Sequence, residues 1–187
     1  MLSKKGLKKS SKGPGRIYQI LPLFLKIFGK VITPLKTREA IKEDFPQIES
    51  LFLEVQKYDT NFDKDVVFDE KTEKETKRSV RRHFIDPNGK FFVAEDKGRI
   101  IGFVFVYFSP AILKSGWINE IFVTEAFRRN GIGSKLMEKG IEWLKQKGAK
   151  KVELTAYKTN QEALSFYKKH HFEKQPAKFI RLGRKIK

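Results

Sequence analysis

The segment Arg128-Arg129-Asn130-Gly131-Ile132-Gly133 lies between a strand-like run, residues 117–123, and a helix-like run, residues 132–147. Its two glycines let a ligand come close to the backbone, because no Cβ intrudes there. The free N–H groups at the start of the following helix point at an anion, and the arginine side chains add charge-assisted donors. The segment therefore predicts a binding site for a phosphorylated ligand.

Two familiar phosphate loops do not match this segment. A dinucleotide fingerprint needs a third glycine or an alanine three residues after Gly133, where Leu136 stands. A Walker loop ends in Gly-Lys-Ser/Thr, whereas Ser134 and Lys135 follow the glycine here in the opposite order. The segment is therefore a phosphate loop of another type.

A second group of residues follows a strand-like run at 152–157. Its members are Asn160, Ala163, the pair Phe166-Tyr167, and Phe172. Together with Arg-x-x-Gly-x-Gly after an apolar strand, they resemble the GCN5-related N-acetyltransferases (GNAT), and the resemblance covers residues 36–187. One departure is His171, where the family usually has glycine. We expect a left-handed backbone there, which histidine tolerates better than a β-branched residue.

The resemblance implies an α+β fold of the α/β/α-sandwich type, with a mixed, mainly antiparallel twisted sheet of about six or seven strands flanked by helices. Residue patterns place the elements. We expect strands at 37–41, 91–95, 100–108, 117–123, 151–157 and 179–182, with helices at 42–57, 70–85, 132–147 and 160–170. Asp44 is expected to cap the first helix, and a tight turn at 96–99 to join the second and third strands.

The resemblance also implies that acetyl-CoA is the co-substrate and that no metal is needed. The residues expected to bind the coenzyme belong to the fourth strand, the glycine loop and the second motif. They are Ile121, Phe122, Val123, Arg128, Arg129, Asn130, Gly131, Ile132, Gly133, Ser134, Asn160 and Tyr167. Within this set, the Val123 N–H is expected to stabilise the oxyanion, and Asn160 to contact the pantetheine.

Glu120 is the candidate general base. It stands in the middle of an otherwise apolar strand, where a carboxylate is costly unless it has a partner or a function. Strand alternation places it on one face with Ile118 and Phe122. The alternative is a surface glutamate paired with a lysine. In the family, a strand-four acid deprotonates the amine, directly or through water, and Tyr167 aligns with the tyrosine that protonates the departing thiolate.

The acceptor site is expected among residues 45–70, 108–116 and 173–179. Five acids gather in the first of these segments, and they suit a cationic amine or a solvated loop equally well: Asp59, Asp63, Asp65, Asp69 and Glu70. Relatives that acetylate ribosomal N-termini carry a glutamate late in the fifth strand. Thr155 stands at that position and argues against such an acceptor.

The net charge of +18 is unevenly distributed. Residues 1–36 hold nine basic side chains and no acid, so half of the surplus lies in a fifth of the chain. The remainder is moderately basic, which suits coenzyme phosphates and is no argument for nucleic acid. The chain has no cysteine, which excludes disulfides and thiolate catalysis and suits a cytoplasmic protein.

The chain is expected to consist of a disordered basic arm (1–15), an amphipathic helical extension (16–35) and an N-acetyltransferase domain (36–187). Lys26 and Lys30 divide the apolar run of the extension, so it is neither a membrane span nor a convincing signal peptide. Its apolar face suits packing on the domain, a homodimer mate, or peripheral contact with a membrane.

We therefore expect an acetyl-CoA-dependent N-acetyltransferase that acts on a primary amine, of a small polyamine-like molecule or of a peptide or protein, by direct attack in a ternary complex. The alternative is a catalytically silent acyl-CoA-binding module whose basic N-terminal extension binds a membrane or nucleic acid.

Overall fold

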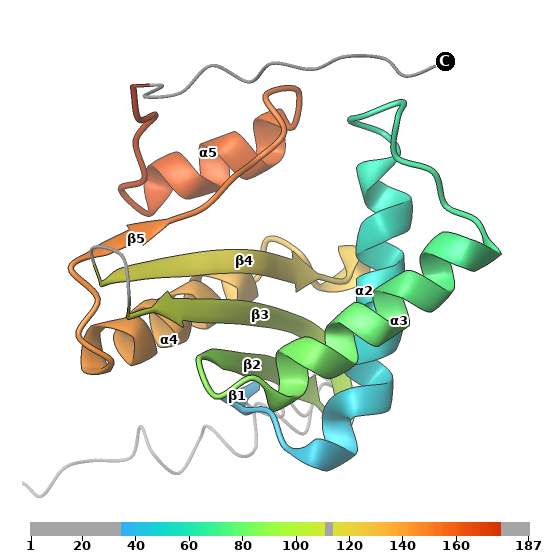
Figure 1. The fold of residues 1–187 in the computed structure, drawn as a ribbon, viewed down its shortest axis with the longest axis horizontal. Coiled ribbons are helices and arrows are strands. Elements are labelled where there is room, and N and C mark those ends of the chain that lie inside the picture. The colour runs from blue at the N-terminus through green and yellow to red at the C-terminus, as the bar shows by residue number, and fades with distance from the viewer. Residues whose placement is uncertain (1–34, 111–113, 177–187) are drawn as a thin grey trace, which may run out of the picture. The chain divides into compact units, whose positions relative to one another are not determined.

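The computed structural model describes residues 35–110 and 114–176. They form one mixed sheet in the order β1-β2-β3-β4-β5, in which β1 to β4 are antiparallel and β5 runs parallel to β4 (Figure 1). The strands are β1 (Lys36–Glu39), β2 (Gly89–Asp96), β3 (Arg99–Ser109), β4 (Ser115–Val123) and β5 (Lys151–Glu153). The predicted α+β fold with a mainly antiparallel sheet is confirmed.

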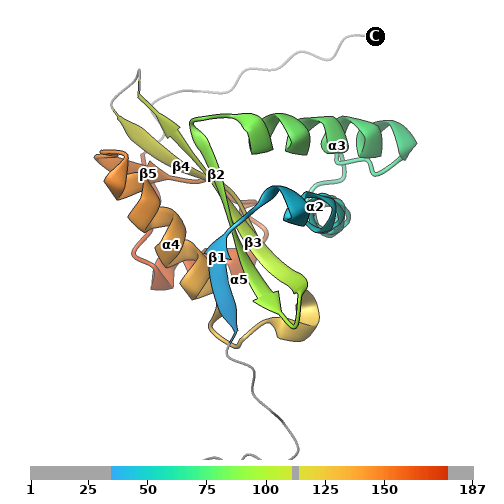
Figure 2. The ribbon, with the colours of Figure 1, turned by 90° about the horizontal axis from the view of Figure 1, so that it is seen from below.

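Helices cover both faces of this sheet. They are α2 (Phe45–Asp59), α3 (Glu70–Ile85), α4 (Ile132–Gln146) and α5 (Gln161–Lys169), with short 3-10 turns η1 (Lys42–Asp44) and η2 (Glu125–Phe127). Figure 2 shows α2 and α3 on one side of the strands and α4 on the other. The last predicted strand, 179–182, and the N-terminal arm and extension lie outside the described residues.

Alternation along β3 builds two cores. Phe103 and Phe105 pack with α2 and α3, while Val104 and Val106 pack with α4. All four side chains are almost fully buried, and each contributes roughly 1.5–3 kcal/mol relative to an exposed position. Unbroken apolar sequence in this strand therefore follows from a sheet covered on both faces.

The turn between β2 and β3 sets the register of the central hairpin. Lys97 and Gly98 both have positive φ, 50° and 80°, as the right-handed twist of a two-residue hairpin requires. The expected turn at 96–99 is present, and both strands extend beyond their predicted ends.

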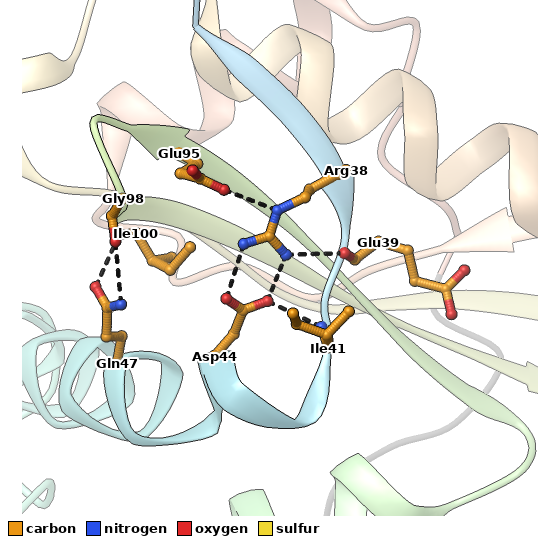
Figure 3. A network of polar contacts seen from close by, with 8 residues as sticks. All are labelled: Arg38, Glu39, Ile41, Asp44, Gln47, Glu95, Gly98 and Ile100. Atoms are coloured by element: carbon orange, nitrogen blue, oxygen red, sulfur yellow. Dashed lines mark hydrogen bonds and ion pairs between the residues drawn. The ribbon is translucent and has the colours of Figure 1, made fainter.

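A polar network attaches the start of α2 to the sheet (Figure 3). Arg38 donates to both carboxylate oxygens of Asp44, with Nη2 to Oδ1 at 2.8 Å, and its Nε donates to Glu95 at 2.8 Å. The Gln47 side chain accepts from the Ile100 N–H at 2.9 Å. Asp44 occupies the predicted cap position, but its side chain accepts no N–H of α2, because Arg38 and the Ile41 N–H hold it. The predicted capping role is therefore wrong.

A β-bulge interrupts β4. Phe105 pairs with Glu120 and Val106 pairs with Ile118, so Asn119 is the extra residue. As a result Ile118 packs on the α4 side, whereas Phe122 packs on the α2 side. The expectation that Ile118, Glu120 and Phe122 share one face is therefore wrong at Ile118.

The fifth strand is shorter than predicted. It pairs with β4 only between Ser115–Trp117 and Lys151–Glu153, and residues 154–157 are not in a strand. Beyond Trp117 the two strands diverge, so the second half of β4 has no partner on that side within the described part of the chain.

In the described residues, no helix is long and apolar enough to cross a membrane.

Candidate active site

A cavity of about 710 Å³ opens where β4 and β5 diverge. Its wall is formed by the end of α2, the second half of β4, the start of α4, and the segment from Thr155 to Lys169. The structure brings every predicted site residue to this wall except Asn130. The two sequence motifs therefore meet at a single site.

The glycine loop forms one end of the cavity. Gly131 has φ of 75° and stands at the N-cap of α4, where it offers no side chain to the first N–H groups of the helix. A Cβ at Gly133 would lie 3.3 Å from the Phe166 ring. Gly131 is required for a left-handed backbone and Gly133 for close approach to α5, so an anion can reach the helix start.

The two loop arginines differ in their surroundings. The Arg128 Nε donates to the Val123 carbonyl at 3.0 Å, and its guanidinium lies 4.9 Å from the centre of the Tyr58 ring. Arg129 is largely exposed and pairs with Glu162 at 3.0 Å. Arg128 therefore anchors the loop to β4, whereas Arg129 is held only by a surface carboxylate.

Asn130 does not line the cavity. Its Nδ2 donates to the carbonyls of Phe127 and Arg128, at 3.2 Å and 3.1 Å. Its role in the structure is to stabilise the turn that precedes Gly131.

The direction of the Val123 N–H follows from strand geometry. The neighbouring Thr124 N–H donates to Ile101 of β3 at 2.9 Å, and N–H groups alternate in direction along a strand. The Val123 carbonyl, on the same side as its own N–H, accepts from Arg128 instead of β3. The Val123 N–H therefore points away from β3, toward the cavity.

Glu120 stands in the cavity wall beside the bulge. It keeps some accessible surface because it faces the cavity, yet burial by the surrounding protein raises its pKa to about 8. The negative charge of Asp59 raises this pKa further, while a hydrogen bond from the Ile121 N–H lowers it. Glu120 has no basic partner within residues 35–110 and 114–176, so the alternative of a lysine-paired surface glutamate is not what the structure shows.

Tyr167 lies on the α5 side of the cavity and packs against the rings of Phe166 and Phe172. Burial raises the pKa of its phenol above the ordinary value, and the charges of Glu120 and Asp59 add to the shift. The hydroxyl therefore keeps its proton at neutral pH and can donate it.

Asn160 caps α5. Its buried side chain accepts from the Ala163 N–H at 3.0 Å, which leaves the amide group as its free donor toward the cavity. The other end of α5 contacts the start of α4, because the Ser134 Oγ and the His170 Nε2 are hydrogen-bonded at 2.9 Å. His171 adopts the expected left-handed conformation, with φ of 63°.

Sequence reasoning named Asp59 only within a group of acids, and it did not name Tyr157 or Glu162 as residues of the site, although all three lie in the wall. Asp59 was one of five acids in the segment 59–70, and of these it alone lines the cavity. Burial raises its pKa to about 6. Only the fold distinguishes it from its neighbours, because it is the last residue of α2 and the others belong to the following loop and α3.

A family model described as the acetyltransferase (GNAT) family matches residues 43–172. A protein of Archaeoglobus fulgidus named as an uncharacterized N-acetyltransferase is 39% identical over 102 residues, which are 49% of this chain and 67% of that protein. An N-alpha-acetyltransferase of Sulfolobus acidocaldarius is 30% identical over 100 residues, 48% of this chain and 60% of that protein. The match to a Methanocaldococcus jannaschii N-acetyltransferase spans only 39% of that relative.

A solved structure of an aminoglycoside N-acetyltransferase in complex with CoA has a TM-score of 0.60 with this chain. It is 15% identical to this chain, and the match covers 80% of this chain and 99% of that chain. At that identity the likeness supports the fold alone. The family model, however, matches more than half of the chain, and both sequence motifs lie within or at the end of the matched region. The chain therefore belongs to the GNAT family of N-acetyltransferases.

Proposed function

We propose that this chain transfers an acetyl group from acetyl-CoA to a primary amine, by direct attack of the amine in a ternary complex. One observation carries the proposal: a single cavity combines a helix start open to an anion with carboxyl groups open to a cation. The glycine loop and its arginines line this cavity, and so do two carboxyl groups without basic partners among the described residues, Asp59 and Glu120. A polyphosphate donor suits the loop, and a cationic acceptor suits the carboxyl groups.

The residues present fit the coenzyme. Gly131 leaves open space at the start of α4, where a Cβ would meet nothing within 4 Å, and the second half of β4 leaves backbone groups open for the amide groups of a pantetheine. Bound acetyl-CoA supplies the thioester whose carbonyl carbon is attacked. The Val123 N–H points into this space and is the donor proposed for the developing oxyanion.

Glu120 is proposed to remove the proton from the ammonium, directly or through water. Its pKa of about 8 lies close to working pH, where a base is most effective. In the free protein at neutral pH it is mostly protonated, because burial and, second to it, the negative charge of Asp59 disfavour its ionised form. An arriving cation favours its ionised form. Tyr167 is proposed to hold the proton that the thiolate takes up.

The test is release of free CoA thiol from acetyl-CoA by the full chain in the presence of small amines and, separately, peptides. Thiol release that depends on an amine, with the acetylated amine detected by mass, supports the proposal. Tight binding of acetyl-CoA without turnover on any acceptor would instead establish the alternative of a silent acyl-CoA-binding module.

Peptide N-termini form a second class of acceptor in this test. The Sulfolobus relative is named an N-alpha-acetyltransferase, but Thr155 lines the cavity here at the position where such relatives carry a glutamate. A panel with free α-amino peptides beside alkyl amines separates the two classes.

A further inference from the structure

Asp59 is a carboxyl group held in the wall of the cavity by the fold. It is the last residue of α2, and only part of its surface is accessible. Among the described residues it has no ion pair, and burial alone accounts for the upward shift of its pKa. A carboxyl group placed this way lacks a counterion that a ligand can supply.

Aromatic rings surround Asp59. Tyr58 and Phe62 meet edge to face with centroids 5.0 Å apart, and Phe62 stacks on Tyr157 at 5.9 Å. Tyr58 and Tyr157 both line the cavity. Faces of such rings attract cations, and aromatic walls exclude water that would weaken an ion pair.

The rings also join two segments distant in sequence. Phe62 belongs to the loop after α2, and its carbonyl accepts from the Thr159 hydroxyl at 3.4 Å, next to Tyr157 in the loop before α5. Arg128 is the nearest described cation on this wall, but it lies over the Tyr58 ring and is bonded to the Val123 carbonyl. It forms no ion pair with Asp59.

Acetyl transfer to a simple amine requires one carboxyl group. The reacting ammonium gives one proton to Glu120, and the new N–C bond forms as the C–S bond of the thioester breaks. The sulfur takes the proton of Tyr167, and the second proton of the attacking nitrogen restores the Tyr167 phenol. Asp59 comes from α2 rather than β4, and this reaction does not use its carboxyl group.

We propose that Asp59 anchors a second, non-reacting cationic nitrogen of the acceptor, so that the preferred substrates are primary amines with another ammonium or guanidinium group on the same flexible chain. This inference rests on the proposed function. The Tyr58 and Tyr157 rings hold the alkyl chain and the cation, Phe62 packs against both rings, and Glu120 serves the nitrogen that reacts.

The experiment compares kcat/KM for three matched series of acceptors. These are α,ω-diamines from putrescine to hexamethylenediamine, monoamines of the same chain lengths, and ω-amino acids of those lengths. For the wild type, kcat/KM is expected to be about 10- to 100-fold higher for a diamine than for its matched monoamine. This is the size of effect expected from one charge-assisted hydrogen bond that is shielded from water. The ω-amino acids should be the poorest, because their carboxylate faces Asp59.

Two variants of Asp59 and one control complete the design. Asp59→Asn should remove the diamine preference, mainly through KM for the diamine, with acetyl-CoA affinity retained. The preference is the ratio of diamine to monoamine kcat/KM, so the change in the Glu120 pKa caused by loss of the Asp59 charge affects both acceptors alike and cancels. Asp59→Lys should shift the preference toward ω-amino acids. Asp65→Asn is the matched control, because Asp65 is exposed and lies outside the cavity wall. It should retain the wild-type ranking.

Three results separate the outcomes. Acetylation of diamines and monoamines with equal efficiency would overturn the inference while the proposed function stands. An equal change for all acceptors in Asp59→Asn, with coenzyme binding and melting temperature retained, would also overturn it, since Asp59 would then act only through the ionisation of Glu120. No acetylation of any amine by protein that binds acetyl-CoA would overturn the proposed function itself.

Discussion

Replacement of Glu120 by glutamine should change the pH profile of acetyl transfer in a defined way. With a pKa of about 8, roughly one-tenth of Glu120 is ionised at pH 7 and about nine-tenths at pH 9. The wild-type kcat/KM should therefore rise about tenfold over this range and level off above pH 8. In Glu120→Gln the rate should follow the free amine, and continue to rise toward the amine pKa near ~10.4.

The size of the loss follows from the role of a general base. Glu120→Gln should lower kcat/KM about 100- to 10,000-fold near pH 8, and the deficit should shrink at higher pH because the amine there deprotonates without help. The assay is thiol release at saturating acetyl-CoA with the acceptor concentration varied below and above its KM, from pH 6 to 10. Glu142→Gln is a matched control, because Glu142 is exposed on α4 and outside the cavity wall.

Stability gives an independent measurement of the same ionisation. The pKa of Glu120 is higher in the folded protein than its ordinary value of 4.5, so the folded state binds this proton more tightly than the unfolded state does. Wild-type stability should therefore decrease as pH rises from about 4.5 to about 8, by roughly 4 kcal/mol at most. The Glu120→Gln variant has no carboxyl group to ionise at this position, so it should not lose stability in this way. Its melting temperature should therefore exceed that of the wild type, by an amount that grows as pH rises toward 8.

Either measurement can refute the reasoning. A variant profile that keeps the break near pH 8 would mean that another group produces it. Equal melting temperatures of the two proteins from pH 5 to 9 would mean that Glu120 is not buried in the way that the cavity requires.

Four further substitutions test other parts of the site and fold. Gly133→Val should weaken acetyl-CoA binding at least about tenfold by calorimetry, because its branched side chain would press on the Phe166 ring and shift the start of α4 that offers its N–H groups to the anion. Unchanged affinity in folded protein would contradict the loop assignment. Tyr167→Phe should lower kcat with coenzyme affinity unchanged, and full activity across the pH range would exclude the proton-donor role. Glu162→Gln should tighten coenzyme binding a few-fold at low salt, because a competing surface anion is removed, whereas weaker binding would show that the carboxylate orders the loop. Arg38→Ala should lower the free energy of unfolding, measured with denaturant, by about 2–4 kcal/mol, because it leaves the buried Asp44 without its ion-pair partner. Arg38 lowers the pKa of Asp44, so the difference in unfolding free energy between variant and wild type should become smaller below about pH 4.

Local chemistry made much of the fold predictable. The hairpin turn at Lys97-Gly98 requires two positive φ values, which few residue pairs supply, so its position was evident from the sequence. The glycine loop was predictable for a related reason, because Gly131 meets a local requirement for positive φ at the start of a helix. Such features depend on a few consecutive residues and not on the rest of the fold.

Features that depend on pairing between strands were not predictable in this way. Periodicity assumes an unbroken strand, and the extra residue Asn119 moves Ile118 to the opposite face from Phe122 without any local signal. The end of β5 at Glu153 is another case, because residues 154–157 are as strand-like as those that pair. Asp44 was misassigned for the same reason, since its partner Arg38 comes from a neighbouring strand.

The bulge and the short β5 together account for the position of the chemistry. A regular β4 paired along its length would cover the Val123 N–H and place Ile118, Glu120 and Phe122 on one face of the sheet. The observed break instead leaves backbone groups of β4 open beside a carboxyl group that lacks a basic partner in the described residues. Both are costs to the folded protein, because buried polar groups without partners are unfavourable. Strand pairing cannot relieve these costs here, whereas a bound ligand with amide groups and a cationic nitrogen can. The departures from regular sheet geometry are thus concentrated where a ligand supplies the missing interactions.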